Sequence, residues 1–167
     1  SGIFPASSDS STVSDKGFFM LMLSKFLHLA AAIIWLGGMV FVLTSLRPVA
    51  IAQLQPSARL TLLSAVLVRF FMLVWASVVA LLLTGLHMLI STGMSNAPKG
   101  WHWMLGIGLL MFAVFGHLYF GPFKRLKRAV ARADWPRASV HLANIHMLVV
   151  TNFCLGWAAV AAVVFLS

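Results

Sequence analysis

Residues 70–90 read FFMLVWASVVALLLTGLHMLI and contain no charged side chain. A run of about 20 apolar residues is long enough to cross the hydrocarbon core of a bilayer as a helix. A lone strand there would leave its backbone N–H and C=O groups without partners in lipid. The run therefore predicts a transmembrane helix, which we extend to residues 60–90.

Three further apolar runs predict spans at residues 18–46, 101–120 and 140–166. The chain is 61% hydrophobic and 9% charged, whereas about a quarter of the residues of a soluble domain are charged. The predicted fold class is all-α integral membrane, a four-transmembrane-helix antiparallel bundle over residues 18–167. Residues 1–17, rich in Ser and Asp, have no hydrophobic period and predict a flexible N-terminal tail.

The net charge of +9 does not indicate nucleic-acid binding, because the basic residues lie mostly between the apolar runs. Arg47 and Arg59 separate the first two spans, and six Lys and Arg residues fall within residues 124–137. Loops rich in Lys and Arg face the cytoplasm. We therefore expect both termini to face outward, which means the periplasm if the source is a Gram-negative bacterium.

Two residue pairs are expected to end helices. Arg47-Pro48 follows the first span and Gly121-Pro122 follows the third, and proline disrupts a helix interior. The basic segment 123–133 is then expected to lie along the inner head-group layer of the bilayer. Gly37-Gly38 and Gly106-x-Gly108 are expected to be points of close helix packing.

Six histidines in so apolar a chain indicate a ligand or metal site, because ionisable residues are costly in a membrane and tend to mark function. Alternating helix directions place one trio toward the outer face and another toward the inner face. The outer trio is His28, His87 and His102, and the inner trio is His117, His141 and His146. The alternative for each histidine is a structural role, capping a helix or bonding a carbonyl group.

Paired imidazoles from facing helices are a common way to hold the iron of haem b. We expect His28 and His87 to bind an outer haem, with His102 as the alternative ligand. A second haem, if present, is expected to use His117 with His146 or His141. Arg69 shares a helix face with His87 and is a candidate to neutralise a haem propionate, or else to reach the lipid interface.

The function that follows from haem ligation is electron transfer by a b-type membrane cytochrome, an oxidoreductase component. Its candidate partners are a quinone or quinol, a periplasmic redox protein, and a second copy of the chain. Copper is the alternative occupant, because nine methionines and six histidines are suitable copper ligands. Met88 and Met94 lie near the outer histidines. A third alternative is an accessory subunit of a respiratory complex.

Two stretches carry a family resemblance. Residues 25–42 read KFLHLAAAIIWLGGMVFV and residues 68–89 read VRFFMLVWASVVALLLTGLHML. They resemble the CopD family of bacterial inner-membrane proteins, and the resemblance extends from Ser24 to Phe165. It implies copper uptake or copper tolerance beside a periplasmic copper-binding partner, in a short four-helix version of the family. The positions that match its motifs are His28, Trp35, Gly37, Gly38, Arg69, Thr84 and Gly85.

Overall fold

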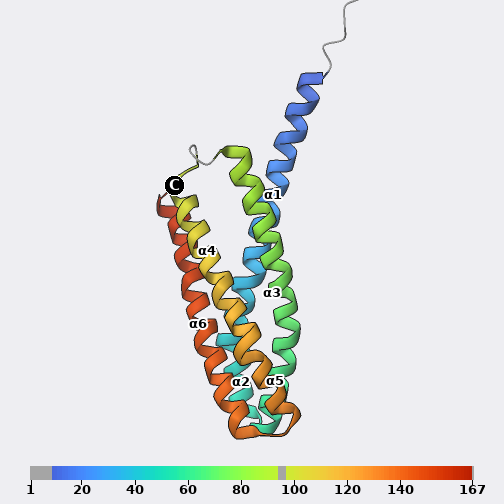
Figure 1. Cartoon of the computed structure of the whole chain (residues 1–167), viewed down its shortest axis with the longest axis vertical. Coiled ribbons are helices and arrows are strands. Elements are labelled where there is room, and N and C mark those ends of the chain that lie inside the picture. Colours follow the sequence, from blue (N-terminus) through green and yellow to red (C-terminus); the bar gives the residue numbers. More distant parts are fainter. Residues whose placement is uncertain (1–8, 94–96, 167) are drawn as a thin grey trace, which may run out of the picture.

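The computed structural model describes residues 9–93 and 97–166, and this part of the chain forms four helical rods that run alternately up and down (Figure 1). Two of the rods contain a π-helical turn, labelled η. The rods are α1 (Asp9–Phe41) with η1 (Val42–Leu46) and α2 (Arg47–Gln53); α3 (Pro56–Thr92); α4 (Lys99–Leu118) with η2 (Tyr119–Phe123) and α5 (Lys124–Ala131); and α6 (Trp135–Leu166). The predicted all-α four-helix fold is confirmed.

Each rod contains a stretch that is long and apolar enough to cross a membrane. In the most apolar window of each stretch, only 17% to 33% of the residues are buried inside the protein. The rest of the apolar surface faces outward, as at Ile90 (72% exposed) and Phe165 (82% exposed). So much exposed apolar surface would be unfavourable in water, so this is a multi-pass membrane protein. The four stretches are Asp15–Gln53, Pro56–Thr92, Lys99–Ala131 and Trp135–Leu166.

The helices are longer than the predicted spans. α1 begins at Asp9, so the part of the predicted tail from residue 9 to residue 17 is helical, and it projects past the other helices (Figure 1). Residues 1–8 lie outside the described part of the chain. Turns at the ends of amphipathic or apolar helices have little hydrophobic pattern, which explains why composition alone placed these boundaries too far inward.

Neither proline-containing pair ends a helix, contrary to the expectation. Pro48 lies in the first turn of α2, directly after the π-helical turn η1, so the carbonyl group four residues earlier belongs to that π turn. Pro122 lies inside the π-helical turn η2. An α-helical turn would bring the proline ring against the carbonyl group four residues earlier, and the wider π turn relieves that clash. The helical direction is therefore kept through both prolines.

The expectation that segment 123–133 lies along the head-group layer is wrong. Lys99–Ala131 forms one continuous stretch, and α5 extends α4 toward the lower end of the bundle in Figure 1. Leu126 and Ala129 are buried (0% and 7% exposed), and α5 packs mainly on α6. Burial of this small apolar face fixes the direction of α5, while its basic side chains stay exposed.

The bundle consists of two closely packed helix pairs, α1 with α3 and α4 with α6. Aromatic side chains join the pairs near the middle. Trp35 of α1 stacks on Phe112 of α4 with ring centroids 5.8 Å apart, and Phe71 of α3 meets Phe115 of α4 edge to face at 5.5 Å. We call the end formed by α2, α5 and their neighbouring links the basic end, since it carries Arg47, Arg59 and the α5 cations.

Two glycines allow side chains of neighbouring helices to approach closely. A Cβ atom at Gly38 would collide with the ring of Phe70, and one at Gly156 would collide with Leu36. A Cβ atom at Gly37, Gly106 or Gly108 would meet nothing within 4 Å. The predicted close packing is therefore confirmed at Gly38 and wrong at the other three predicted glycines, because their helix faces point away from a neighbour.

Gly37 and Gly38 give a matched pair for a stability measurement. We expect Gly38→Ala to lower the free energy of unfolding by about 1–3 kcal/mol, the usual cost of overpacking. Gly37→Ala should be neutral or stabilising by roughly 0.5–1 kcal/mol, since alanine favours the helix and meets no neighbour. Thermal unfolding in detergent, followed by fluorescence-detected gel filtration, measures both. Equal melting temperatures for the two variants would contradict the close contact.

Candidate metal site between α1 and α3

His28 lies on α1 and faces α3. Its Nδ1 atom is 2.9 Å from the hydroxyl oxygen of Thr84. Gly85 lies beside the same ring, and a Cβ atom at Gly85 would be 3.3 Å from the ring carbon Cε1. The imidazole is half-buried. The packing of α1 on α3 therefore fixes the position of the ring and engages its Nδ1 atom in a hydrogen bond.

His87 lies on α3 and makes the reciprocal contact. Its Nδ1 atom is 2.9 Å from the hydroxyl oxygen of Ser24 on α1. Because the helices are antiparallel, Ser24 and His28 on one helix face His87 and Thr84 on the other. Each helix therefore supplies one imidazole and one hydroxyl group. The two contacts lie about one helical turn apart along the seam, roughly 6 Å for four residues.

The hydrogen bonds of Thr84 determine which nitrogen of His28 carries the proton. The Thr84 hydroxyl donates its only hydrogen to the carbonyl oxygen of Ala80, at 2.6 Å. Its oxygen must then accept the hydrogen bond from Nδ1–H of His28. In the neutral ring the Nε2 atom of His28 then carries no proton and keeps a lone pair, which is the state of an imidazole that binds a metal ion.

The hydroxyl groups that hold the rings are themselves buried. Ser24 is 9% exposed and Thr84 is 8% exposed. Within residues 15–93 and 97–166, Ser24 makes no side-chain hydrogen bond other than the one to His87, so it can donate to or accept from that ring. A hydroxyl group of this kind supports either tautomer of His87, including the one that leaves Nε2 free.

An open groove of about 510 Å³ lies beside His87, between the beginning of α1 and the end of α3. Met20, Leu21 and Ser91 are among the residues that line it. The thioether of Met20 is a soft ligand of the type that suits Cu(I). Lys16 also lines the groove, so any metal ion would be held there by ligand chemistry and not by negative charge.

The remaining predicted site residues lie elsewhere. His102 is exposed in the first turn of α4, and its Nδ1 atom is 3.3 Å from the carbonyl oxygen of Pro98. His117 is exposed on α4, and Arg69 is exposed on α3. His141 and His146 are half-buried on α6. Met94 lies outside the described residues, and Met88 is buried (6% exposed).

The two predicted histidine trios do not close into metal-binding groups. All six histidines belong to the described residues, and in that part of the chain no three His, Cys, Asp or Glu residues lie close enough to hold one metal ion. The structure instead brings His28 and His87 to one seam, with Ser24 and Thr84 between them. The sequence did contain a signal for the role of Ser24. Its hydroxyl group lies one helical turn before His28, on the helix that runs antiparallel to the helix of His87.

Comparison with protein-family models gives a match to CopD, described as copper resistance protein D, over residues 64–166. The match spans more than half of the chain. This chain belongs to the CopD family. The matched part of this CopD-family chain includes Arg69, Thr84, Gly85 and His87, and it begins after the stretch that holds His28. The comparisons with curated proteins and with solved structures gave no match.

Haem b does not fit between His28 and His87 in this arrangement. Two axial imidazoles must stand on opposite sides of one iron atom with the porphyrin plane between them. Here the two rings lie a turn apart and each contacts the opposite helix directly. Gly85 lies against the His28 ring, so the seam is closed at this depth. The matched family is described as copper resistance protein D, and the inner haem pairing stays an untested prediction.

Asn152 is a polar residue that the sequence analysis missed. It lies in the middle of α6, is 2% exposed, and its side-chain oxygen has no hydrogen-bond partner among the described residues. A buried acceptor without a partner costs about 1–3 kcal/mol. An asparagine among apolar residues of a span is the only sequence signal for it.

We expect Asn152→Leu to stabilise the protein, because leucine has a similar size and removes the unpaired oxygen. The gain should be about 1 kcal/mol or more, which corresponds to roughly 2–4 °C in melting temperature for a chain of this size. Thermal unfolding in detergent measures it. Asn144→Leu, on the exposed side of α6, is the matched control and should change the melting temperature little. A lower melting temperature for Asn152→Leu would show that the oxygen has a partner.

Proposed function

We propose that this chain handles copper at the membrane, with a copper ion as its cargo and His28 and His87 as the residues that bind it. The observation that carries the proposal is the reciprocal pair of hydroxyl–imidazole contacts across the α1–α3 seam. Hydroxyl groups that hold Nδ1 leave Nε2 as the metal-binding atom. Membership of the copper resistance protein D family supports copper as the metal.

The chemistry of the seam suits Cu(I) better than a hard cation. Two imidazoles and the nearby thioether of Met20 offer nitrogen and sulfur donors, and Cu(I) prefers such ligands. Mg²⁺ and Ca²⁺ need several oxygen ligands, mainly carboxylates and carbonyls. No carboxylate of the described residues lies at the seam, because Asp9 and Asp15 come fifteen and nine residues before Ser24 and Asp134 lies at the basic end.

The groove beside His87 gives the ion a way to the seam. It opens at the end of the bundle away from the basic end, where α1 begins and α3 finishes. An ion bound first by Met20 and His87 would reach His28 about one turn deeper, roughly 6 Å along the helix axis. Taking the ion from a periplasmic copper-binding partner into this groove is the uptake or tolerance function that we propose.

Anaerobic titration of the detergent-purified protein with Cu(I), in competition with a chromophoric chelator, tests the proposal. We expect about one tightly bound Cu(I) per chain, and no absorption bands of haem after reduction with dithionite. The contradicting result is a protein that, purified from haem-replete cells, shows sharp low-spin b-type bands and does not compete for Cu(I). That result would overturn copper handling as the proposed function and favour electron transfer.

We also propose that the basic end faces the cytoplasm and that both termini face outward, following the excess of Lys and Arg at that end. Cys154 is the only cysteine, so single-cysteine variants can be made in a Cys154→Ser background. We expect Ser167→Cys to react with an impermeant maleimide in spheroplasts. Ala131→Cys, at the end of α5, should react only after lysis. The reverse pattern would invert the topology.

A further inference from the structure

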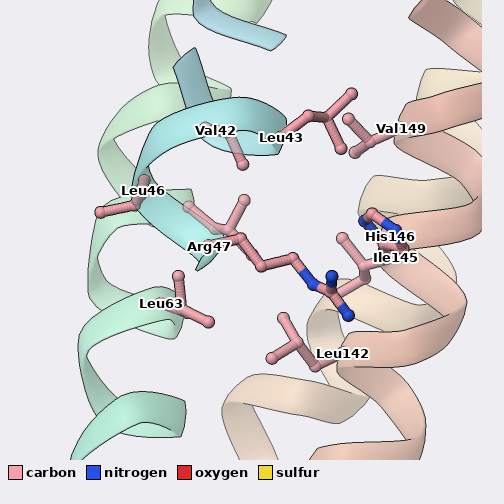
Figure 2. Close-up of a pocket in the computed structure, with 10 residues that line it drawn as sticks. Val42, Leu43, Leu46, Arg47, Leu63, Leu142, Ile145, His146 and Val149 are labelled. Carbon is pink, nitrogen blue, oxygen red and sulfur yellow. The ribbon is translucent and has the colours of Figure 1, made fainter. Parts of the chain in front are cut away.

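A second pocket lies at the basic end, between η1, α3 and α6 (Figure 2). Its enclosed space is about 20 Å³, enough for about one water-sized group, so a larger group would bind at its open mouth. Most of its wall is apolar, formed by Leu43, Leu46, Leu63, Leu142 and Val149. Arg47 and His146 are its polar lining residues.

Arg47 reaches into this pocket from the end of η1. Figure 2 shows its side chain extending from α2 toward α6, with the guanidinium group near Ile145 and His146. The side chain is half-buried. The π turn before Arg47 contains one residue more than an α turn, and one residue corresponds to about 100° of rotation about the helix axis. The π turn therefore helps to set the face on which Arg47 lies.

No carboxylate balances this arginine. The sequence has three acidic residues. Asp9 and Asp15 belong to the far end of the first rod, with Asp15 about 48 Å from Arg47 along the helix axis at 1.5 Å per residue. Asp134 is 3.4 Å from Arg137 and pairs with it. Among the described residues, Arg47 has no acidic partner and no side-chain hydrogen bond.

A half-buried positive charge against an apolar wall is costly unless an anion accompanies it. The planar fork of arginine matches the oxygens of a phosphate group in a bidentate contact, and the imidazole of His146 offers one more N–H donor. We propose that the mouth of this pocket, where the guanidinium group of Arg47 and the imidazole of His146 lie, binds the phosphate group of an anionic membrane lipid. This proposal does not depend on the copper site, which lies toward the opposite end of the bundle.

The surroundings favour a lipid over free phosphate as the source of the phosphate group. The half-buried side chains of Leu43, Leu46 and Leu142 in the wall offer apolar contacts to acyl chains, and a free phosphate ion would leave them uncovered. The pocket also lies at the end of the bundle with the excess of basic residues, where anionic head groups gather. The exposed cations of α5 attract the same lipids, but without an apolar wall or a half-buried guanidinium group.

The test is the thermal stabilisation of the full chain, purified in a neutral detergent, by added lipid. Phosphatidylglycerol at about 100 times its Kd should raise the melting temperature by roughly 5–10 °C. Phosphatidylcholine, whose phosphate is balanced by choline, should raise it much less. Arg47→Gln should lose most of the phosphatidylglycerol shift. Arg125→Gln removes an equal charge from the exposed face of α5 and should retain it.

The proposal is overturned if the phosphatidylglycerol shift of Arg47→Gln equals that of the wild type, or if Arg125→Gln loses as much of the shift as Arg47→Gln does. Inorganic phosphate at matched ionic strength should give no shift, and an Arg47-dependent shift as large as that of the lipid would overturn the lipid source. If Arg47→Gln does not fold, Arg47→Lys and His146→Ala replace it. Full shifts in both of these variants overturn the proposal as well.

Discussion

Replacement of His28 or His87 with alanine is expected to weaken Cu(I) binding by more than about 100-fold. Loss of a partner that only positions a metal ligand typically costs roughly 10–100-fold in affinity, and loss of the ligand itself should cost more. His28 and His87 are the two histidines whose Nδ1 atoms are held across the α1–α3 seam. The measurement is the Cu(I) competition titration, repeated for each variant.

His102→Ala is the matched control for this prediction. His102 is also a histidine near the same end of the bundle, but it is exposed and its Nδ1 atom faces the carbonyl oxygen of Pro98 at 3.3 Å. We expect this variant to bind Cu(I) as the wild type does. If His102→Ala loses the ion while His28→Ala and His87→Ala keep it, the site is not at the seam.

Thr84→Val is expected to lower the affinity for Cu(I) by roughly 10–100-fold although Thr84 does not touch the ion. Valine has nearly the same shape as threonine but cannot accept the hydrogen bond from Nδ1–H of His28. The ring then loses the contact that fixes its orientation and its tautomer. Both the dissociation constant and the temperature of unfolding should be measured, because a positioning residue should change the first more than the second.

Thr84→Ser separates the effect of the hydroxyl group from the effect of the methyl group, because serine keeps only the hydroxyl group. Serine keeps an oxygen that can donate to the carbonyl of Ala80 and accept from His28. We therefore expect its Cu(I) affinity to stay within a few-fold of the wild type. Equal affinities for Thr84→Val and the wild type would mean that the hydroxyl group only satisfies the helix backbone, and that His28 needs no support.

The sequence by itself determined the membrane class, the number of helices and the apolar centres of the spans. These follow from runs such as residues 70–90, because lipid forces any spanning segment to satisfy its own backbone hydrogen bonds. It also indicated that His28 and His87 belong to adjacent antiparallel helices. The ends of the helices were less predictable, since Pro48 and Pro122 act through local geometry that a residue pattern does not contain.

Only the tertiary structure decided which polar groups meet. The crosswise contacts of Ser24 with His87 and of His28 with Thr84 depend on the rotation and offset of α1 against α3, and a shift of one residue would turn each side chain by about 100°. The same holds for Arg47, whose place beside His146 depends on the π turn η1 and on the distant helix α6 (Figure 2). Hydrophobic periodicity fixes which side of a helix faces lipid, but the packing of one helix on another fixes the register from which a site is built.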